Sequence, residues 1–510
     1  MESQLEIVDQ LKKTLELLSM QKSEDISTES WVNTTLSNDP DQYYKDFAHK
    51  YIDFIYENPT TYHTIEYAAK LLKDSGFTYV NEKDNWNDHV EKYGKYFTVR
   101  NGTNLVAFVM GKNWKHVNGV GAIGTHIDSL AAKLKPASIK ESVEGFQTLG
   151  VAPYGGSLNE LWFDRDLGLG GRVLYKKENS SKIEQKLVDS TPAPIARIPS
   201  LAPHFGKPAE GPFDKEDKAV PVMGYCPIEN CQQWQATDEE KKCPLYGKHS
   251  MQVLRYVAKM ANIKVSQIVQ LDLDLFDVQK GVIGGINNDF LIAPRMDDKL
   301  CSFAALWSLV EFAKDVNPED LDTFSVLGLF DNEEVGSLTR QGARGGFMEK
   351  TIERAVFYHS DELTPNCLSA MYSNSIILSA DVNHMFNPNF AEVYMKNHSP
   401  KPNVGVTLSL DPNAHMATDT VGLAFVEELA RKNGDKVQYF QIKNNSRSGG
   451  TVGPFLAAQT GARTIDLGIA QLAMHSIRAT TGCKDVGLGI KFFQGFYKEW
   501  RSVYDNFGEL

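Results

Sequence analysis

The sequence predicts an α/β fold that is interrupted by an inserted second domain. Strand-like apolar runs alternate with helix-like segments: strands at 324–330, 375–379, 437–442 and 464–467, helices at 300–315 and 421–432. A segment from about 138 to 280, rich in proline and with an acidic polar middle, breaks this alternation. With 510 residues, the chain is also too long for one ordinary hydrophobic core, so two or more domains are expected.

The expected organisation has four parts. Residues 1–20 are predicted to form an amphipathic helix, and residues 21–45, which are polar and aperiodic, a flexible linker. Residues 46–137 and 281–510 are expected to form the main domain and residues 138–280 the inserted domain. The apolar stripe of the N-terminal helix has heptad spacing through Val8, Leu11, Leu15 and Leu18. So short a helix needs a partner for this stripe, either its own globular body or another molecule.

The composition, with 42% hydrophobic and 23% charged residues, is typical of a soluble globular protein. A formal net charge of -12 opposes binding to nucleic acid or to an anionic membrane surface. We expect no membrane insertion, because no apolar run approaches the roughly 20 residues of a membrane helix. The N-terminus lacks a basic segment followed by an apolar core, so conventional secretion is not expected.

The six cysteines are sparse and form no CxxC pair. Cys226, Cys231 and Cys243 could hold a structural zinc, but a tetrahedral site needs a fourth ligand and tighter spacing. Free thiols in a polar insert are the simpler interpretation.

The most informative stretch is FSVLGLFDNEEVG, residues 324–336. Its apolar run ends abruptly in Asp331, Asn332, Glu333 and Glu334. Ligands bind at the carboxyl ends of strands in open α/β sheets. Two adjacent carboxylates beside a buried strand are costly without a cation, so this stretch predicts one side of a metal site.

Further candidate ligands fall at the ends of other predicted strands or in the turns after them: His126 with Asp128, Asp297 with Asp298, Asp381, and His475. Two imidazoles and several carboxylates suit a zinc-type centre. Each residue alone has a simpler interpretation, since a lone histidine is usually an ordinary polar residue and an Asp-Asp pair often caps a helix.

Two spacings favour a functional interpretation. In His126-x-Asp128, the carboxylate is placed to fix the tautomer of a metal-bound imidazole. Glu333 and Glu334 would point to opposite sides of an extended backbone, so that one can bind metal while the other serves as a general base.

The stretches GTHIDS, APRMDDKLCSF, DNEEVGS, SADVNH and LAMHSIR, in this order and spacing, resemble the aspartyl aminopeptidase family of dinuclear zinc aminopeptidases. The resemblance runs from about residue 45 to the end of the chain. It implies a mixed-sheet zinc-peptidase catalytic domain with an inserted mainly-β lid and dimerisation domain. It also implies hydrolysis of the N-terminal peptide bond by metal-activated water.

The resemblance assigns roles to the candidate residues. Two zinc ions per subunit would share Asp297; His126 and Asp381 would complete one site, Glu334 and His475 the other. Glu333 would be the general base, and Asp128 would orient His126. His204, in IPSLAPHF, matches a histidine that the family lends to a neighbouring subunit's active site, although by sequence alone it is an ordinary loop residue.

The resemblance further implies a hollow tetrahedral dodecamer that acts on peptides. The N-terminal helix would be a propeptide that a selective-autophagy receptor recognises, so that a zymogen made in the cytoplasm reaches the vacuole.

One position departs from the aspartyl-preferring members, which have a lysine in the strand before the helix that starts near Asp419; alignment puts Ser409 there. Loss of this cation predicts a preference for neutral, apolar N-terminal residues such as leucine. The alternatives are a cytoplasmic aspartyl aminopeptidase and a catalytically silent assembly or cargo protein. A two-metal phosphoesterase is disfavoured, because the sequence has no Arg/Lys-rich phosphate cradle.

Overall fold

The computed structural model describes residues 40–86, 90–206, 214–227, 235–359 and 364–510. The chain divides into two units, Met1–Gln42 and Tyr43–Leu510. The N-terminal helix at 1–20 and most of the linker at 21–45 lie outside the described residues, so both stay predictions. The first helix of the described residues, α2, spans Gln42–Glu57 and therefore begins inside the range expected as linker.

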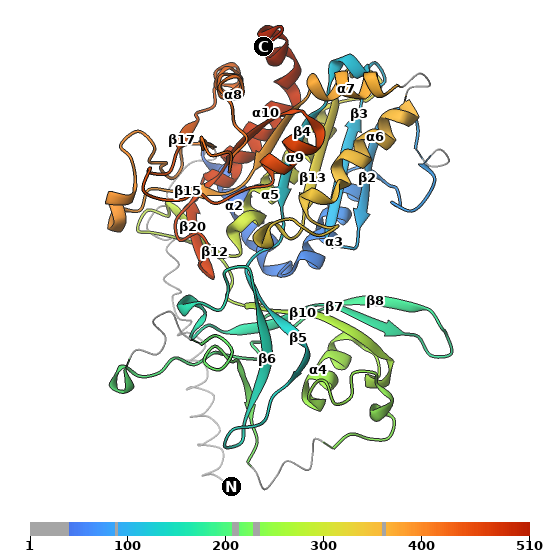
Figure 1. Ribbon diagram of the computed structural model, residues 1–510, viewed down its shortest axis with the longest axis vertical. Helices are drawn as coiled ribbons and strands as arrows, with labels where there is room; N and C mark the ends of the chain where they lie inside the picture. Colours follow the sequence, from blue (N-terminus) through green and yellow to red (C-terminus); the bar gives the residue numbers. More distant parts are fainter. Residues whose placement is uncertain (1–39, 87–89, 207–213, 228–234, 360–363) are drawn as a thin grey trace, which may run out of the picture. The chain divides into compact units, whose positions relative to one another are not determined.

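The larger sheet of the second unit has nine strands in the order β1-β2-β3-β13-β4-β14-β18-β16-β17. Figure 1 shows its strands β2, β3, β13 and β4 side by side. In that order the strands are Thr78–Tyr79, Gly94–Arg100, Asn104–Met110, Phe324–Phe330, Gly121–His126, Ile376–Ala380, Arg463–Gly468, Thr407–Ser409 and Gln438–Phe440. The central strands β13, β4, β14 and β18 are parallel, while β3 and β16 run antiparallel to their neighbours in this group. The predicted α/β fold with a mixed sheet is therefore confirmed.

Helices cover both faces of this sheet. Alternate strand residues point to opposite sides, and the strands carry apolar side chains on both, so both faces need to be buried. Ile123 and Leu327 belong to one buried cluster, and their neighbours Ala122 and Val326 belong to another. The first cluster is closed by α2, α3 (Thr61–Asp74), α5 (Met296–Asp315), α8 (Thr420–Asn433) and α10 (Asp485–Tyr504). The second is closed by α6 (Phe347–His359), α7 (Pro365–Ser373) and α9 (Gly453–Thr460). Burial on both faces explains why β3 and β13 are almost entirely apolar, apart from Asn104 and Ser325.

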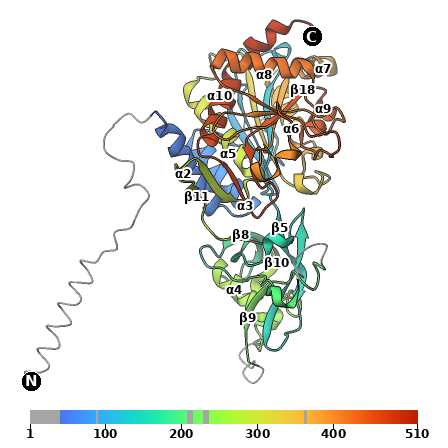
Figure 2. The same cartoon turned by 90° about the vertical axis from the view of Figure 1, so that its left-hand side faces the viewer.

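A second sheet has six antiparallel strands in the order β8-β7-β10-β5-β6-β9. In that order they are Ile183–Asp189, Leu167–Lys176, Ile268–Asp277, Ala131–Ile139, Phe146–Tyr154 and Val222–Tyr225. Helix α4 (Met251–Ala261) packs against β8, and Figure 2 shows it beside this sheet. All six strands come from residues 131–277, and β5 begins at Ala131, before the boundary predicted at 138. The inserted domain at 138–280 stays a prediction.

Two smaller sheets complete the described strands. The first joins β11 (Val282–Gly284), β12 (Phe290–Pro294) and β20 (Arg478–Gly482), and the second pairs β15 (Asn383–His384) with β19 (Ala470–Gln471). No helix among the described residues has the length and apolar character needed to cross a membrane.

Candidate metal centre

The predicted ligands gather at the carboxyl ends of three neighbouring strands, β13, β4 and β14. His126 is the last residue of β4, and Asp381 follows β14 directly. Glu333 and Glu334 lie in the short 3-10 helix Glu333–Val335, just after β13. Parallel pairing brings these strand ends to one edge of the sheet, and so these side chains meet.

Two other segments complete the site. Asp297 and Asp298 open α5, with non-helical backbone angles and a cis peptide bond between them. His475 lies in the turn between β19 and β20 and has a positive φ of 61°. These segments approach the strand ends from far away in sequence.

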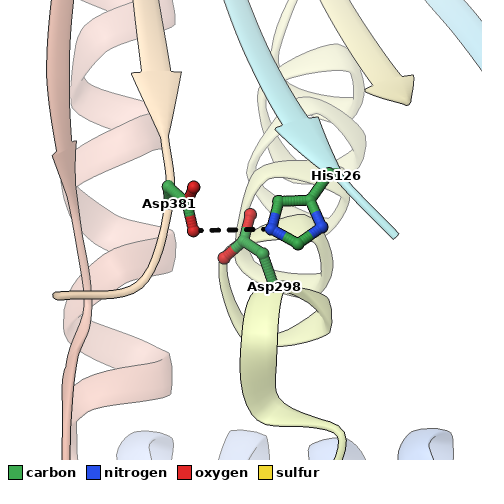
Figure 3. Close-up of side chains that lie close together, drawn as sticks. All are labelled: His126, Asp298 and Asp381. Atoms are coloured by element: carbon green, nitrogen blue, oxygen red, sulfur yellow. Dashed lines mark ion pairs between the residues drawn. The ribbon is translucent and has the colours of Figure 1, made fainter. Parts of the chain in front are cut away.

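His126, Asp298 and Asp381 form the first group of acids and imidazole. They come from β4, α5 and the end of β14, and their side chains converge in Figure 3. Nε2 of His126 lies 3.6 Å from Oδ1 of Asp381. One ligand atom from each of the three residues lies within 4.8 Å of the others.

Asp297, Glu334 and His475 form the second group, with ligand atoms equally close. Nε2 of His475 lies 3.3 Å from Oδ2 of Asp297 and 3.7 Å from Oε2 of Glu334. The other oxygen of Asp297, Oδ1, lies 3.2 Å from Nε2 of His126 in the first group. The Asp297 carboxylate therefore stands between the two groups.

Asp128 holds the surrounding parts in position. Its Oδ1 lies 3.2 Å from Nδ1 of His126, so that Nε2 is the ring nitrogen directed at the carboxylates. The backbone N–H groups of Glu333 and Glu334 donate to Oδ1 and Oδ2 of Asp128, each at 3.1 Å. Asp128 is 1% exposed. One buried carboxylate thus organises an imidazole and a turn that carries two acids.

Burial and mutual repulsion dominate the electrostatics. Burial raises the pKa of Glu333 to about 8; the carboxylates around it add to this rise, and His126 opposes it. Burial also raises the pKa values of Asp298 and Glu334 well above their ordinary range. For Asp297, burial favours a higher pKa, but hydrogen bonds from His126 and His475 outweigh it and hold the pKa low.

The residues fit a pair of zinc ions. Both carboxylate oxygens of Asp298 and Oε1 of Glu334 are buried without a hydrogen-bond partner. Within the described parts of the chain, no lysine or arginine forms an ion pair with an acid of either group; His126 and His475 are the basic partners of Asp297, Glu333, Glu334 and Asp381. Buried acids without such a counter-ion require cations, and mixed imidazole and carboxylate donors suit zinc.

Two predicted residues lie apart from this cluster. His204 lies in the exposed 3-10 helix Pro203–Phe205, so its role in a neighbouring active site stays a prediction. Ser409 ends β16, is 5% exposed, and accepts a hydrogen bond from Nδ2 of Asn383 at 2.5 Å. Of the three cysteines considered for a structural zinc, Cys226 and Cys243 are both buried, and Cys231 is outside the described residues.

Sequence reasoning missed three features of the site. It placed Asp298 beside Asp297 among the candidate ligands and as a possible helix cap, but it assigned Asp298 to neither zinc ion. It also treated Glu333 and Glu334 as extended, whereas Asn332 has a φ of 62° and turns the chain into a 3-10 helix. No local pattern pointed to Tyr154, whose hydroxyl donates to Oδ2 of Asp128 at 2.7 Å.

A mixed α/β sheet whose strand ends carry two acid–imidazole groups, with one carboxylate between them, defines the class of metal-dependent hydrolases. Comparison with known proteins gives the family. The family described as "Aminopeptidase I zinc metalloprotease (M18)" matches residues 54–497, and the chain belongs to this family.

Individual relatives are similar over nearly the whole chain. "Vacuolar aminopeptidase 1" of Saccharomyces cerevisiae is 61% identical over 516 aligned residues, which cover 100% of both chains. A structure described as "Crystal structure of prApe1" has a TM-score of 0.88 and 64% identity, over 91% of this chain and 96% of that one. "Structure of S. cerevesiae mApe1 dodecamer" has a TM-score of 0.84 and 60% identity, over 92% of this chain and 100% of that one.

Proposed function

We propose that this member of the zinc aminopeptidase family is dinuclear and removes neutral or apolar N-terminal residues, such as leucine, from peptides. The observation that carries the proposal is the position of Asp297, whose two oxygens lie 3.2 Å from His126 and 3.3 Å from His475. A carboxylate in this position is suited to bridge two ions.

Asp297 would be the shared ligand. His126 and Asp381 would complete the site of one zinc ion, and Glu334 and His475 the site of the other. Asp298 lies in the first group and would place a buried carboxyl group beside that ion. When bound, the two ions would supply Lewis-acid activation of a water molecule and of the scissile carbonyl.

Glu333 would carry the proton. Its Oε2 lies 3.8 Å from Nε2 of His126, and its side chain, 16% exposed, belongs to neither group of ligands. Glu333 is therefore available to accept a proton from the attacking water and to deliver it to the leaving amine. Cations nearby favour the ionised form of this carboxylate, which a base requires. His204 from another subunit would stabilise the oxyanion.

The preference for neutral residues rests on the surroundings of the second group. Apolar side chains line the cavity beside Asp297 and His475: Leu130, Trp162, Phe276, Met296 and Ile477. Arg295 also lines it, but its guanidinium donates to the backbone carbonyls of Asp277 and Ile55. Ser409, at the position where aspartyl-preferring relatives have lysine, brings no charge.

We further propose that the protein assembles as a dodecamer and works in the vacuole. The support is the similarity to relatives whose names include "Vacuolar aminopeptidase 1" and "mApe1 dodecamer". Residues 1–20 would be the propeptide helix that drives assembly and binds a selective-autophagy receptor; the vacuolar relative matches the chain over its full length.

A peptidase assay tests this function. The purified protein should hydrolyse a leucine peptide faster than an aspartate peptide, lose activity with a chelator, and regain it with zinc. Glu333→Gln should lower kcat by a factor of about 100 or more, because it removes the proton acceptor. Full activity in Glu333→Gln would refute the general-base role, and chelator-resistant hydrolysis would refute the metal mechanism.

A further inference from the structure

Tyr154 links the six-stranded sheet to the metal centre. It is the last residue of β6, and its hydroxyl donates a hydrogen bond to Oδ2 of Asp128 at 2.7 Å. The same hydroxyl accepts a hydrogen bond from Nδ2 of Asn332 at 2.9 Å. Asn332 immediately precedes the two acids of the Glu333–Glu334 turn. One phenol therefore joins a strand of the second sheet to two residues around the metal site.

The carboxylate that Tyr154 contacts is the centre of the supporting network. Oδ2 of Asp128, which accepts from Tyr154, also accepts the backbone N–H of Glu334 at 3.1 Å. Oδ1 accepts the N–H of Glu333 at 3.1 Å and lies 3.2 Å from Nδ1 of His126. A rotation of this carboxylate would therefore disturb His126 and both acids of the turn at once.

Tyr154 is itself held firmly. Its backbone N–H donates to Oγ of Ser157 at 3.0 Å, and that hydroxyl donates to the carbonyl of Ala131 at 2.7 Å. The next residue, Gly155, packs directly on the turn: a Cβ atom at Gly155 would lie 3.3 Å from both Cβ and the carbonyl oxygen of Glu334. The end of β6 thus supports the turn by close packing as well as through the hydroxyl.

The phenol is suited to a donor role. Burial, followed by the charge of Asp128, raises the pKa of Tyr154, so the hydroxyl keeps its proton at any pH at which the enzyme works. The partners of the Tyr154 hydroxyl are Asp128 and Asn332, neither of which is a proposed ligand. Its contribution would therefore pass through Asp128.

We propose that Tyr154 is a positioning residue: by fixing Asp128, it sets the geometry of His126 and of the Glu333–Glu334 turn, and it thereby couples the six-stranded sheet to metal binding. The inference rests on the proposed function, which makes His126 and Glu334 zinc ligands and Glu333 the base. Outer partners of metal ligands commonly contribute a factor of about 10–100 in metal affinity or activity.

The test is the zinc affinity of Tyr154→Phe in the full chain, measured by competition with a chromogenic chelator. Tyr154→Phe should weaken zinc binding about 10–100-fold and lower kcat, with the KM for a leucine peptide nearly unchanged. The matched control is Tyr175→Phe, which removes another hydroxyl of the same sheet, one that donates to Glu184 at 2.9 Å. This control should bind zinc like the wild type.

A double-mutant cycle tests whether Tyr154 acts through Asp128. In an Asp128→Asn background, Tyr154→Phe should change zinc affinity by less than about twofold, because the carboxylate that it positions is gone. If Tyr154→Phe failed to fold, Asn332→Gly would remove the other partner of the hydroxyl while tolerating the positive φ, and should also weaken zinc binding.

The outcomes distinguish failure of the positioning role of Tyr154 from failure of the proposed function. Wild-type affinity in Tyr154→Phe, or an equal effect of Tyr154→Phe with and without Asp128, would overturn the positioning role and leave the proposed function standing. A wild-type protein that bound no zinc would overturn both. Full activity in Glu333→Gln, together with a loss of zinc affinity in Tyr154→Phe, would overturn the general-base role alone.

Discussion

Oδ1 of Asp297 lies 3.2 Å from Nε2 of His126, and the opposite oxygen faces His475 at 3.3 Å. The carboxylate lies between two imidazoles, those of His126 and His475, which are far apart in the sequence. This relationship makes Asp297 the one side chain on which both proposed metal ions depend.

Substitutions should therefore change zinc stoichiometry unequally. Asp297→Ala should reduce the zinc content from two ions per chain toward none, because it removes the proposed ligand of both ions. His475→Ala should retain about one ion, because the first group and Asp297 both stay in place. Metal analysis after gel filtration measures this difference. Asp411→Asn, which changes an acid paired with His415 away from the centre, is the control and should retain two ions. An equal loss of zinc from Asp297→Ala and His475→Ala would contradict the proposal that Asp297 is a ligand of both ions.

Zinc binding should release protons near pH 7. In the metal-free protein, burial raises the pKa of Glu333 to about 8, so this carboxyl is mostly protonated at pH 7 and loses its proton when cations arrive. Zinc affinity should consequently rise with pH up to about 8. Calorimetric titrations in buffers of different ionisation enthalpy count the protons, and Glu333→Gln should release about one fewer. Equal proton release from both proteins would show that Glu333 is already ionised.

His63 should make the fold sensitive to acid. Burial lowers its pKa from 6.5 to about 4, and its Nδ1 lies 2.8 Å from the hydroxyl of Thr60. The folded state therefore binds fewer protons than the unfolded state between pH 4 and 6.5, so the free energy of unfolding falls as pH falls through this window. The loss is on the order of 3 kcal/mol for a shift of this size.

Melting temperatures from pH 4 to 8 check this expectation. His63→Gln should remain closer to constant stability across the window, because a neutral side chain has no proton to exclude. Substitution of the exposed His49 by glutamine is the control and should follow the wild type. If the melting temperatures of wild type and His63→Gln fell in parallel as the pH is lowered, His63 would not be the source of the acid sensitivity.

Substrate preference should respond to charge at position 409. Ser409→Lys places a cation where aspartyl-preferring relatives have lysine, so the ratio of kcat/KM for aspartate over leucine peptides should rise about tenfold or more. Ser409→Ala should keep the preference for leucine. A wild-type preference for acidic peptides, or an unchanged ratio in Ser409→Lys, would contradict the specificity proposal.

Local sequence patterns predicted the strands and helices that carry the site, but not the contacts between distant segments that complete it. The strand predicted at 324–330 is β13, residue for residue, because burial on both faces favours a run with only one polar residue, Ser325. The strand ends then place His126, Glu333, Glu334 and Asp381 at one edge. Helix α5 begins at Met296, four residues before the predicted start. The prediction began too late because the opening residues of the helix include two acids and lack an apolar period.

The remaining features depend on contacts between distant parts of the sequence. Asp298 joins His126 and Asp381 through a local backbone bend that no periodicity marks. The contact between Tyr154 and Asn332 spans 178 residues and joins the end of β6 to the turn that follows β13 in the other sheet. Neither feature has a local signature, because each follows from how the strands pair rather than from residue spacing.

Stepwise zinc titration of the metal-free enzyme, with occupancy and hydrolysis of a leucine peptide recorded together, tests the central claim most directly. If two ions share Asp297, activity should saturate at two zinc ions per chain. Asp297→Ala should then stay inactive at any zinc concentration. Full activity at one ion per chain, or activity in Asp297→Ala restored by excess zinc, would contradict the dinuclear site.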